Sequence, residues 1–98
     1  MYFFDWDENK NATNIIKHGI SFEEASSVFL DERALMFDDP EHSEDGEDRF
    51  LLLGMSEEAN LCLVCHCYRE SDSVIRLISA RKATKKEGER YVRGIWYW

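Results

Sequence analysis

The chain contains 98 residues, of which 44% are hydrophobic and 13% aromatic, so it is long enough for one small domain with its own core. Its three cysteines all lie between Cys62 and Cys67, which argues against a disulfide framework and favours a reducing environment. No apolar run approaches the length of a membrane span, and the N-terminus lacks a signal-peptide pattern. We therefore expect a soluble, cytoplasmic protein without a membrane partner.

Charge is distributed unevenly along the chain. The net charge is −8, and the sequence pI is about 4.8. Residues 1–68 contain 16 acidic and 4 basic residues, whereas residues 69–98 contain 4 acidic and 8 basic residues. The total disfavours nucleic acid as a ligand, because phosphate contacts need cations. The basic last third, however, can meet an anionic ligand, and the acidic remainder can meet a basic partner.

Two helices are predicted near the N-terminus. The short aromatic segment 2–6 forms either a strand or a buried arm. Residues 8–18 read as a helix that Asp7 caps and Gly19 ends, with Ala12, Ile15 and Ile16 on its buried side.

A second helix is predicted over residues 22–30. Ser21 and Glu24 have the spacing of a capping box, and Phe22, Ala25, Ser26 and Phe29 follow the spacing of a buried helical face.

Four strands and a last helix follow. The strands are predicted at residues 34–37, 49–53, 61–68 and 74–79, with Gly54 ending the second. Short loops join the last three, so an antiparallel meander is expected. Thr84 and Glu87 form a capping box that opens a helix reaching about residue 93. The order predicts one α+β domain over residues 1–98: two N-terminal helices, an antiparallel sheet of about four strands and a C-terminal helix. The aromatic tail 95–98 has no assigned place.

The junction at residues 74–86 (VIRLISARKATKK) is the most informative stretch. Strict alternation places Val74, Arg76 and Ile78 on one face of the strand, with Ile75, Leu77 and Ser79 on the other. The strand then runs through a basic segment into a helix N-terminus, which itself attracts anions. A phosphate or carboxylate site is one interpretation, and a solvated strand end is the other.

The Cys62–Cys67 segment resembles a zinc site, but its strand period argues against one. Cys62 and His66 would share one face, while Cys65 and Cys67 share the other, so the four side chains cannot converge on one ion. We therefore expect core cysteines and no metal ion or cofactor. His66 is either a general acid or base, or a buried polar residue.

The cations suggest chemistry on RNA. A 2′-OH can attack its own phosphate without a metal if the site supplies a proton acceptor, a proton donor and cationic stabilisation. The proton carriers to consider are His66, Glu87 and Lys82. The cations of the last third that can hold phosphate are Arg69, Arg76, Arg81, Lys82, Lys85 and Lys86. Lys17 and His18 end a helix, where cations stabilise the dipole; a functional role requires them to lie near Arg81 in space.

Several separated segments resemble the BrnT toxin family. They are residues 6–10 (WDENK), Asn14, residues 17–25 (KHGISFEEA) and 28–29 (VF), residues 37–43 (FDDPEHS) with 49–50 (RF), and residues 78–87 (ISARKATKKE). Together they cover nearly the whole chain, in the family's order.

The resemblance implies a RelE-like fold and a type II toxin that cleaves RNA without a metal and inhibits translation. It implies a BrnA-like antitoxin with a DNA-binding domain, so that DNA is contacted only through the antitoxin, and a homo-oligomer or a toxin–antitoxin heterotetramer. The positions carried over as catalytic are Arg69, Arg76, Arg81 and Lys82, and Lys17 and His18 are further positions shared with the family. From the residues themselves, His66 is added as a catalytic candidate. The positions predicted to bind RNA are Lys17, His18, Lys85 and Lys86. The alternative is a non-enzymatic partner of a DNA-binding antitoxin that acts in operon autoregulation.

Overall fold

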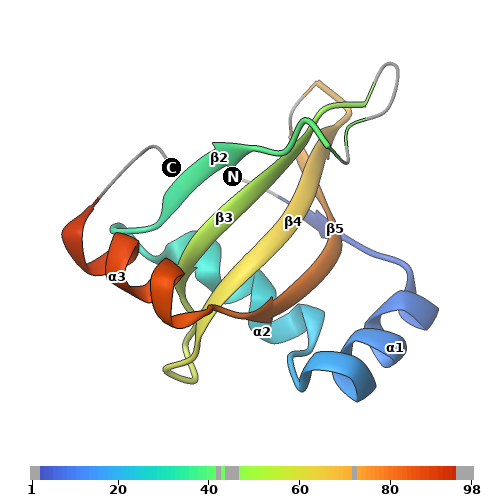
Figure 1. Ribbon diagram of the computed structural model, residues 1–98. Coiled ribbons are helices and arrows are strands. Elements are labelled where there is room, and N and C mark those ends of the chain that lie inside the picture. Colours follow the sequence, from blue (N-terminus) through green and yellow to red (C-terminus); the bar gives the residue numbers. More distant parts are fainter. Residues whose placement is uncertain (1–2, 42, 44–46, 72, 95–98) are drawn as a thin grey trace.

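One five-stranded sheet organises the computed structural model, which describes residues 3–41, 43, 47–71 and 73–94. The elements in chain order are β1 (Phe3–Asp5), α1 (Glu8–His18), α2 (Phe22–Ser27), the 3-10 turn η1 (Val28–Leu30), β2 (Leu35–Asp38), β3 (Arg49–Met55), β4 (Leu61–Arg69), β5 (Val74–Lys82) and α3 (Lys85–Arg93). The strand order is β1-β5-β4-β3-β2 (Figure 1). None of the described helices is long and apolar enough to cross a bilayer.

The α+β class is confirmed, but the sheet differs from the prediction. Strands β3 to β5 form the expected antiparallel meander, and β2 also pairs antiparallel with β3. Segment 2–6, predicted as either a strand or a buried arm, contains the fifth strand, β1, which pairs in parallel with β5. The sheet is therefore mixed, with one parallel pair at its β1 edge and antiparallel pairs elsewhere. Residue 42, residues 44–46 and the tail 95–98 lie outside the described residues.

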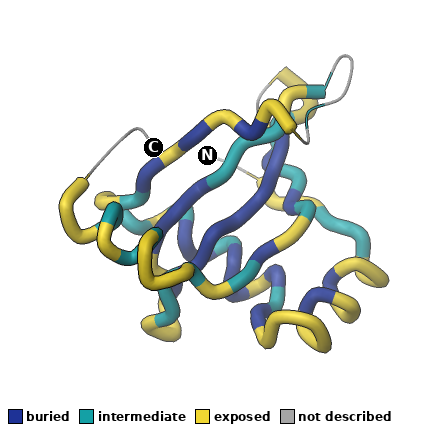
Figure 2. The backbone as a smooth tube through the Cα atoms, in the orientation of Figure 1, coloured by how far each residue is buried: buried dark blue, intermediate teal, exposed yellow. Residues whose placement is uncertain are grey.

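The helices cover the two faces of the sheet unequally. On one face, Ile20, Phe22, Ala25 and Val28 pack with sheet residues such as Leu77 in a core of fully buried side chains. On the other face, α3 covers only one end, where Tyr91 packs on a smaller cluster made by β2, β3 and β4. Figure 2 shows the consequence: the central strands are buried, whereas α1 and α3 are largely exposed. Half of the second face is thus left open.

Helix α1 begins and ends as predicted, but its inner face is polar. Asp7 accepts hydrogen bonds from the backbone N–H groups of Asn9 and Lys10, and Gly19 adopts a left-handed conformation with φ of 72°. Ile15 and Ile16, expected in the core, are 46% and 87% exposed. The buried residues are instead Asn11 and Asn14, whose side chains bond backbone groups of neighbouring segments.

Helix α2 begins as predicted at Ser21, which accepts a hydrogen bond from the N–H of Glu24. The expected reciprocal bond of a capping box is replaced. The carboxylate of Glu24 turns to the β3–β4 hairpin and accepts hydrogen bonds from Ser56 and Asn60 at 2.6 and 2.7 Å. A buried carboxylate needs such donors, so Glu24 ties α2 to that turn.

Gly54 lies inside β3 and does not end it. A Cβ atom there would lie 2.8 Å from Cγ1 of Val28 and 2.9 Å from Cβ of Ala34. The glycine therefore permits close approach of β3 to η1 and to the start of β2.

His66 belongs to the core of the helix-covered face. Its ring is 0% exposed and contacts the rings of Phe29, Phe50 and Tyr68 at centroid distances of 4.9, 6.0 and 5.3 Å. Its Nδ1 lies 3.3 Å from the carbonyl of Val64, while Nε2 has no partner among the described residues. Burial lowers the pKa of His66 to about 4, so the imidazole is neutral at physiological pH.

Two glycine substitutions test the packing. Gly54→Ala should lower the free energy of unfolding by about 1–3 kcal/mol, since the methyl group overpacks the core. Gly88→Ala is the matched control: its Cβ would lie 3.7 Å from Leu61, and alanine should raise helix stability by about 0.5–1 kcal/mol. Urea denaturation measures both. Equal effects of the two substitutions would contradict the close approach at Gly54.

His66 should make stability depend on pH. The unfolded chain gains a proton on this residue below about pH 6.5, whereas the folded chain gains it only near pH 4. Stability should therefore fall by up to ~3 kcal/mol as the pH drops from 6.5 to 4. In His66→Phe this loss should largely disappear, because phenylalanine fits among the aromatic neighbours and does not titrate. Urea denaturation across this pH range, with His18→Gln as a control for losing an exposed imidazole, measures the difference. A slope unchanged in His66→Phe would refute the assignment.

Candidate functional site

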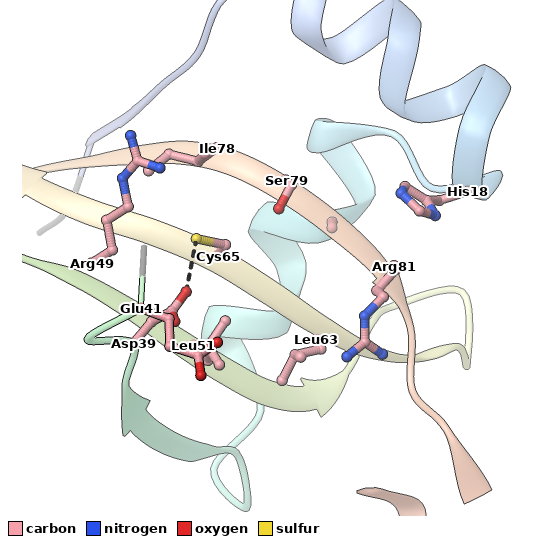
Figure 3. Close-up of a pocket in the computed structure, with 11 residues that line it drawn as sticks. His18, Asp39, Glu41, Arg49, Leu51, Leu63, Cys65, Ile78, Ser79 and Arg81 are labelled. Carbon is pink, nitrogen blue, oxygen red and sulfur yellow. Dashed lines mark hydrogen bonds between the residues drawn. The ribbon is translucent and has the colours of Figure 1, made fainter. Parts of the chain in front are cut away.

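A cavity of about 510 Å³ occupies the open half of the second sheet face. Figure 3 shows His18 and Arg81 at one end, Asp39 and Glu41 with Cys65 toward the other, and Ser79 between the two ends. The complete lining is His18, Asp39, Glu41, Arg49, Leu51, Leu63, Cys65, Ile78, Ser79, Ala80 and Arg81. Residues from α1, the segment after β2, and strands β3 to β5 therefore meet at one concave site, the common form of a ligand pocket.

A bulge in β5 turns Arg81 toward this cavity. The pairing of β4 with β5 shifts from Cys65↔Ser79 to His66↔Leu77, so Ile78 is an extra residue in β5. As a result, Leu77 and Ala80 both face the helix-covered core despite their odd spacing. We predicted that side chains alternate strictly between the two faces through Ser79, but the bulge at Ile78 interrupts this alternation. Ser79 and Arg81 move to the cavity face, and Lys82 moves away from it.

Asn14 brings the end of α1 to the same place. Its Nδ2 donates hydrogen bonds to the carbonyls of Ile20 and Ala80 at 2.8 and 2.7 Å, and its Oδ1 accepts one from the N–H of Ala80 at 3.1 Å. His18 follows Asn14 by about one helical turn, and Arg81 directly follows Ala80. This fulfils the spatial condition set for a role of His18: it lines the same cavity as Arg81.

Glu87 holds the guanidinium of Arg81 in place. Nη1 and Nη2 of Arg81 donate to the two carboxylate oxygens at 2.8 and 2.9 Å, and Nη1 also donates to the carbonyl of Lys82. The hydrogen bond from Arg81 lowers the pKa of Glu87, and the same contact raises the pKa of Arg81. Three of the five N–H donors of arginine are used in these bonds. The Nε–H and the second Nη2–H of the guanidinium take no part in these bonds. These two donors are parallel, a geometry that suits two oxygens of a phosphate.

The other end of the cavity carries carboxylates. Asp39 is 7% exposed and accepts a hydrogen bond from the thiol of Cys65 at 3.8 Å. Burial, with the charge of Asp39, raises the pKa of Cys65 to about 11, so this thiol stays protonated and unreactive. Arg49 borders the same end, and its Nε lies 3.5 Å from Glu47.

A second, shallower cavity of about 310 Å³ adjoins the first. The two share His18, Ile78 and Ser79. Lys10 and Lys17, seven residues apart on one face of α1, line the second cavity. Lys17 thus lies beside the first cavity and not in it.

The remaining candidate residues are spread over the molecule. Lys82 lies on the opposite face, where its charge acts on the carboxylate of Glu24. Arg76 forms an ion pair with Asp5 at 2.6 Å, and Arg69, near the far end of the sheet, forms one with Glu47 at 3.4 Å. Lys85 lines a groove beside α3, and Lys86 is exposed.

His66 lies in the helix-side core, so it does not reach the cavity. Of the nine proposed site residues, the structure therefore brings only His18 and Arg81 together in this cavity.

Four polar cavity residues were not among the proposed site residues: Asp39, Glu41, Arg49 and Ser79. All four lie in segments that resemble the BrnT family. Asp39 and Glu41 flank a proline after a strand, and Arg49 begins the next strand. Local patterns could not show that these positions meet β5, because their contacts depend on strand pairing.

Comparisons with known proteins identify the family of this chain. The sequence profile described as "Ribonuclease toxin, BrnT, of type II toxin-antitoxin system" matches residues 6–87. A crystal structure of the Brucella abortus ribonuclease toxin BrnT superposes with a TM-score of 0.65 and 24% sequence identity, over 87% of this chain and 100% of that chain. A search of curated protein sequences found no match. The profile covers most of the chain, including His18 and Arg81. The chain therefore belongs to the BrnT family of ribonuclease toxins of type II toxin–antitoxin systems.

Proposed function

We propose that the cavity between α1 and β5 is the ribonuclease site, where the RNA 2′-OH attacks the adjacent phosphate. The observation that carries this proposal is that His18 and Arg81, from opposite ends of the chain, line one cavity. His18 can accept and donate a proton in turn, and Arg81 carries a fixed positive charge, so the pair can supply the proton acceptor, the proton donor and the cationic stabilisation that this reaction requires. Because the 2′-OH is the nucleophile, the reaction needs no metal-activated water, and we propose a metal-independent enzyme.

His18 is the proton carrier in this proposal. Histidine is the usual general acid or base near neutral pH, and His18 is exposed at the cavity. Glu87 suits this role poorly, because Arg81 occupies both of its oxygens and lowers its pKa. His66 is excluded by its position in the core. Serving as both base and acid in turn would let His18 return its proton to the leaving 5′-oxygen.

Arg81 stabilises the charge that develops on the phosphate. Its bidentate contact with Glu87 fixes the orientation of the guanidinium, and with it the direction of the remaining Nε–H and Nη2–H donors. The proposal assigns Lys17 a contact with a neighbouring phosphate through the adjoining cavity. Arg69, Arg76, Lys82, Lys85 and Lys86 lie outside the main cavity, and we assign them no contact with the reacting phosphate.

The partner proposed is a protein antitoxin, as membership of a type II system implies. We propose that it is BrnA-like and that it carries the DNA-binding domain. The net charge of −8 makes this chain a weak ligand for DNA by itself. Cleavage of RNA in the cytoplasm by the free toxin would inhibit translation until an antitoxin covers the cavity.

Neighbouring substitutions test the site. Arg81→Ala should reduce RNA cleavage by about 10²–10³-fold, the usual effect of losing one charge-stabilising group. His18→Ala should reduce it by about 10²–10⁴-fold. Lys82→Ala is the matched control, because it removes an adjacent cation from the opposite face and should change the rate much less. Cleavage is measured on purified protein with EDTA present, and growth is followed after induced expression.

Circular dichroism would show that each variant is folded. Full activity of Arg81→Ala, or a Lys82→Ala defect as large as that of Arg81→Ala, would contradict the site. Growth arrest without RNA cleavage by folded wild-type protein would favour the non-enzymatic partner function. Loss of cleavage in EDTA that is restored by a divalent metal would contradict the metal-independent reaction.

A further inference from the structure

Ser79 occupies a central position on the surface that the two cavities share. It lines both the main cavity and the shallower one beside α1, and His18 is the other polar residue common to the two linings. In Figure 3, Ser79 lies on β5 between the two ends of the main cavity. A ligand that extends from one cavity into the other therefore passes this side chain.

The hydroxyl of Ser79 has no hydrogen-bond partner among the residues that the structure describes. Several other serines connect neighbouring segments through their hydroxyls. Those of Ser27 and Ser43 accept hydrogen bonds from backbone N–H groups, and that of Ser56 donates to Glu24. Within the described chain, Ser79 has no such structural task, so its hydroxyl can offer one donor and two acceptor positions to a ligand.

The bulge at Ile78 sets the position of Ser79 relative to Arg81. Because the pairing of β4 with β5 shifts there, both residues line the main cavity. Residues two apart on one face of a strand have Cα atoms about 6.5 Å apart. A single phosphate group can bridge a hydroxyl and a guanidinium at this spacing, because each hydrogen bond spans about 3 Å.

A neutral donor at this point complements the arginine during the reaction. When the 2′-oxygen bonds to phosphorus, negative charge builds on the two non-bridging oxygens until the bond to the 5′-oxygen breaks. A hydroxyl that donates to one of these oxygens forms a stronger hydrogen bond as the charge grows. The proton of the 2′-OH passes to His18 and then to the leaving 5′-oxygen, so Ser79 neither gains nor loses a proton.

We propose that Ser79 is a further catalytic residue, whose hydroxyl donates a hydrogen bond to a non-bridging oxygen of the reacting phosphate beside the contact of Arg81. The catalytic part of this inference rests on the proposed RNA cleavage. The phosphate contact itself needs no reaction, so the binding of a ligand that cannot be cleaved tests it separately.

Three variants separate the hydroxyl from the rest of the side chain. Ser79→Ala removes it at an exposed position of β5. Ser79→Thr keeps the hydroxyl and adds a methyl group that strands accept well. Ser26→Ala is the matched control, because it removes a serine hydroxyl that donates to the carbonyl of Glu23 within α2, outside both cavities. Circular dichroism would show that each variant is folded.

Binding is measured by titration calorimetry at low ionic strength with a single-stranded trinucleotide of 2′-deoxynucleotides. This probe presents phosphodiesters but lacks the attacking hydroxyl. Ser79→Ala should bind it about 3–10-fold more weakly than the wild-type protein, the usual effect of one lost hydrogen bond. Ser79→Thr and Ser26→Ala should bind it with affinities close to that of the wild-type protein.

Cleavage is measured on the matching RNA trinucleotide. Ser79→Ala should lower kcat by about 10–100-fold, less than the loss of a buried donor because Ser79 is exposed. Replacing one non-bridging oxygen by sulfur, a weaker acceptor, tests the contact directly. One of the two phosphorothioate isomers should be cleaved more slowly than the oxygen substrate by the wild-type protein. This difference should shrink in Ser79→Ala, which has already lost the hydrogen bond, whereas a purely structural role would leave it unchanged.

Each result decides a different point. Wild-type binding and cleavage by Ser79→Ala, or an equal loss in Ser26→Ala, would overturn the inference. A lower rate of Ser79→Ala with an unchanged ratio between oxygen and sulfur substrates would overturn it as well, as would absence of binding by the wild-type protein. Weaker binding of the deoxy probe by Ser79→Ala alone, without cleavage of RNA by the wild-type protein, would support the phosphate contact and reject the proposed ribonuclease activity.

Discussion

The hydrogen bonds between the side chain of Asn14 and the peptide of Ala80 hold the candidate site together. One amide satisfies both the N–H and the carbonyl of a strand residue 66 positions away, and its second Nδ2 proton closes the turn at Ile20. Breaking this contact would leave buried polar groups unpaired, at a cost of about 1–3 kcal/mol for each. These hydrogen bonds therefore hold α1 against β5, and they keep His18 and Arg81 at the same cavity.

The sheet has a closed face and a half-open face, and this asymmetry creates the cavity. Two helices and η1 cover the first face, while α3 covers only one end of the second. The bulge at Ile78 then decides which cations reach the open area: it directs Arg81 into the cavity and Lys82 to the other side. Two adjacent basic residues that look equivalent in the sequence thus have different surroundings.

Acidity of the whole chain and cationic chemistry at one site are compatible in this arrangement. A protein with a net charge of −8 is not suited to a long electrostatic contact with RNA, because counterion release requires many cations. A small cavity with one oriented guanidinium and one imidazole needs few. We therefore expect recognition to be concentrated on the nucleotide in the cavity, with Lys10 and Lys17 adding a neighbouring contact.

The sequence by itself determined the local structure and the family. The caps at Asp7, Ser21 and Thr84 and the glycine at position 19 set helix boundaries, because capping depends on neighbouring backbone groups. The separated BrnT-like segments were recognisable without any structure. Only the tertiary structure decided the polar inner face of α1, the parallel pairing of β1, the place of Gly54 within β3 and the meeting of His18 and Arg81, out of nine candidates, at one cavity. Each of these depends on contacts between residues distant in the chain, and a single extra residue in β5 reverses every side chain after it.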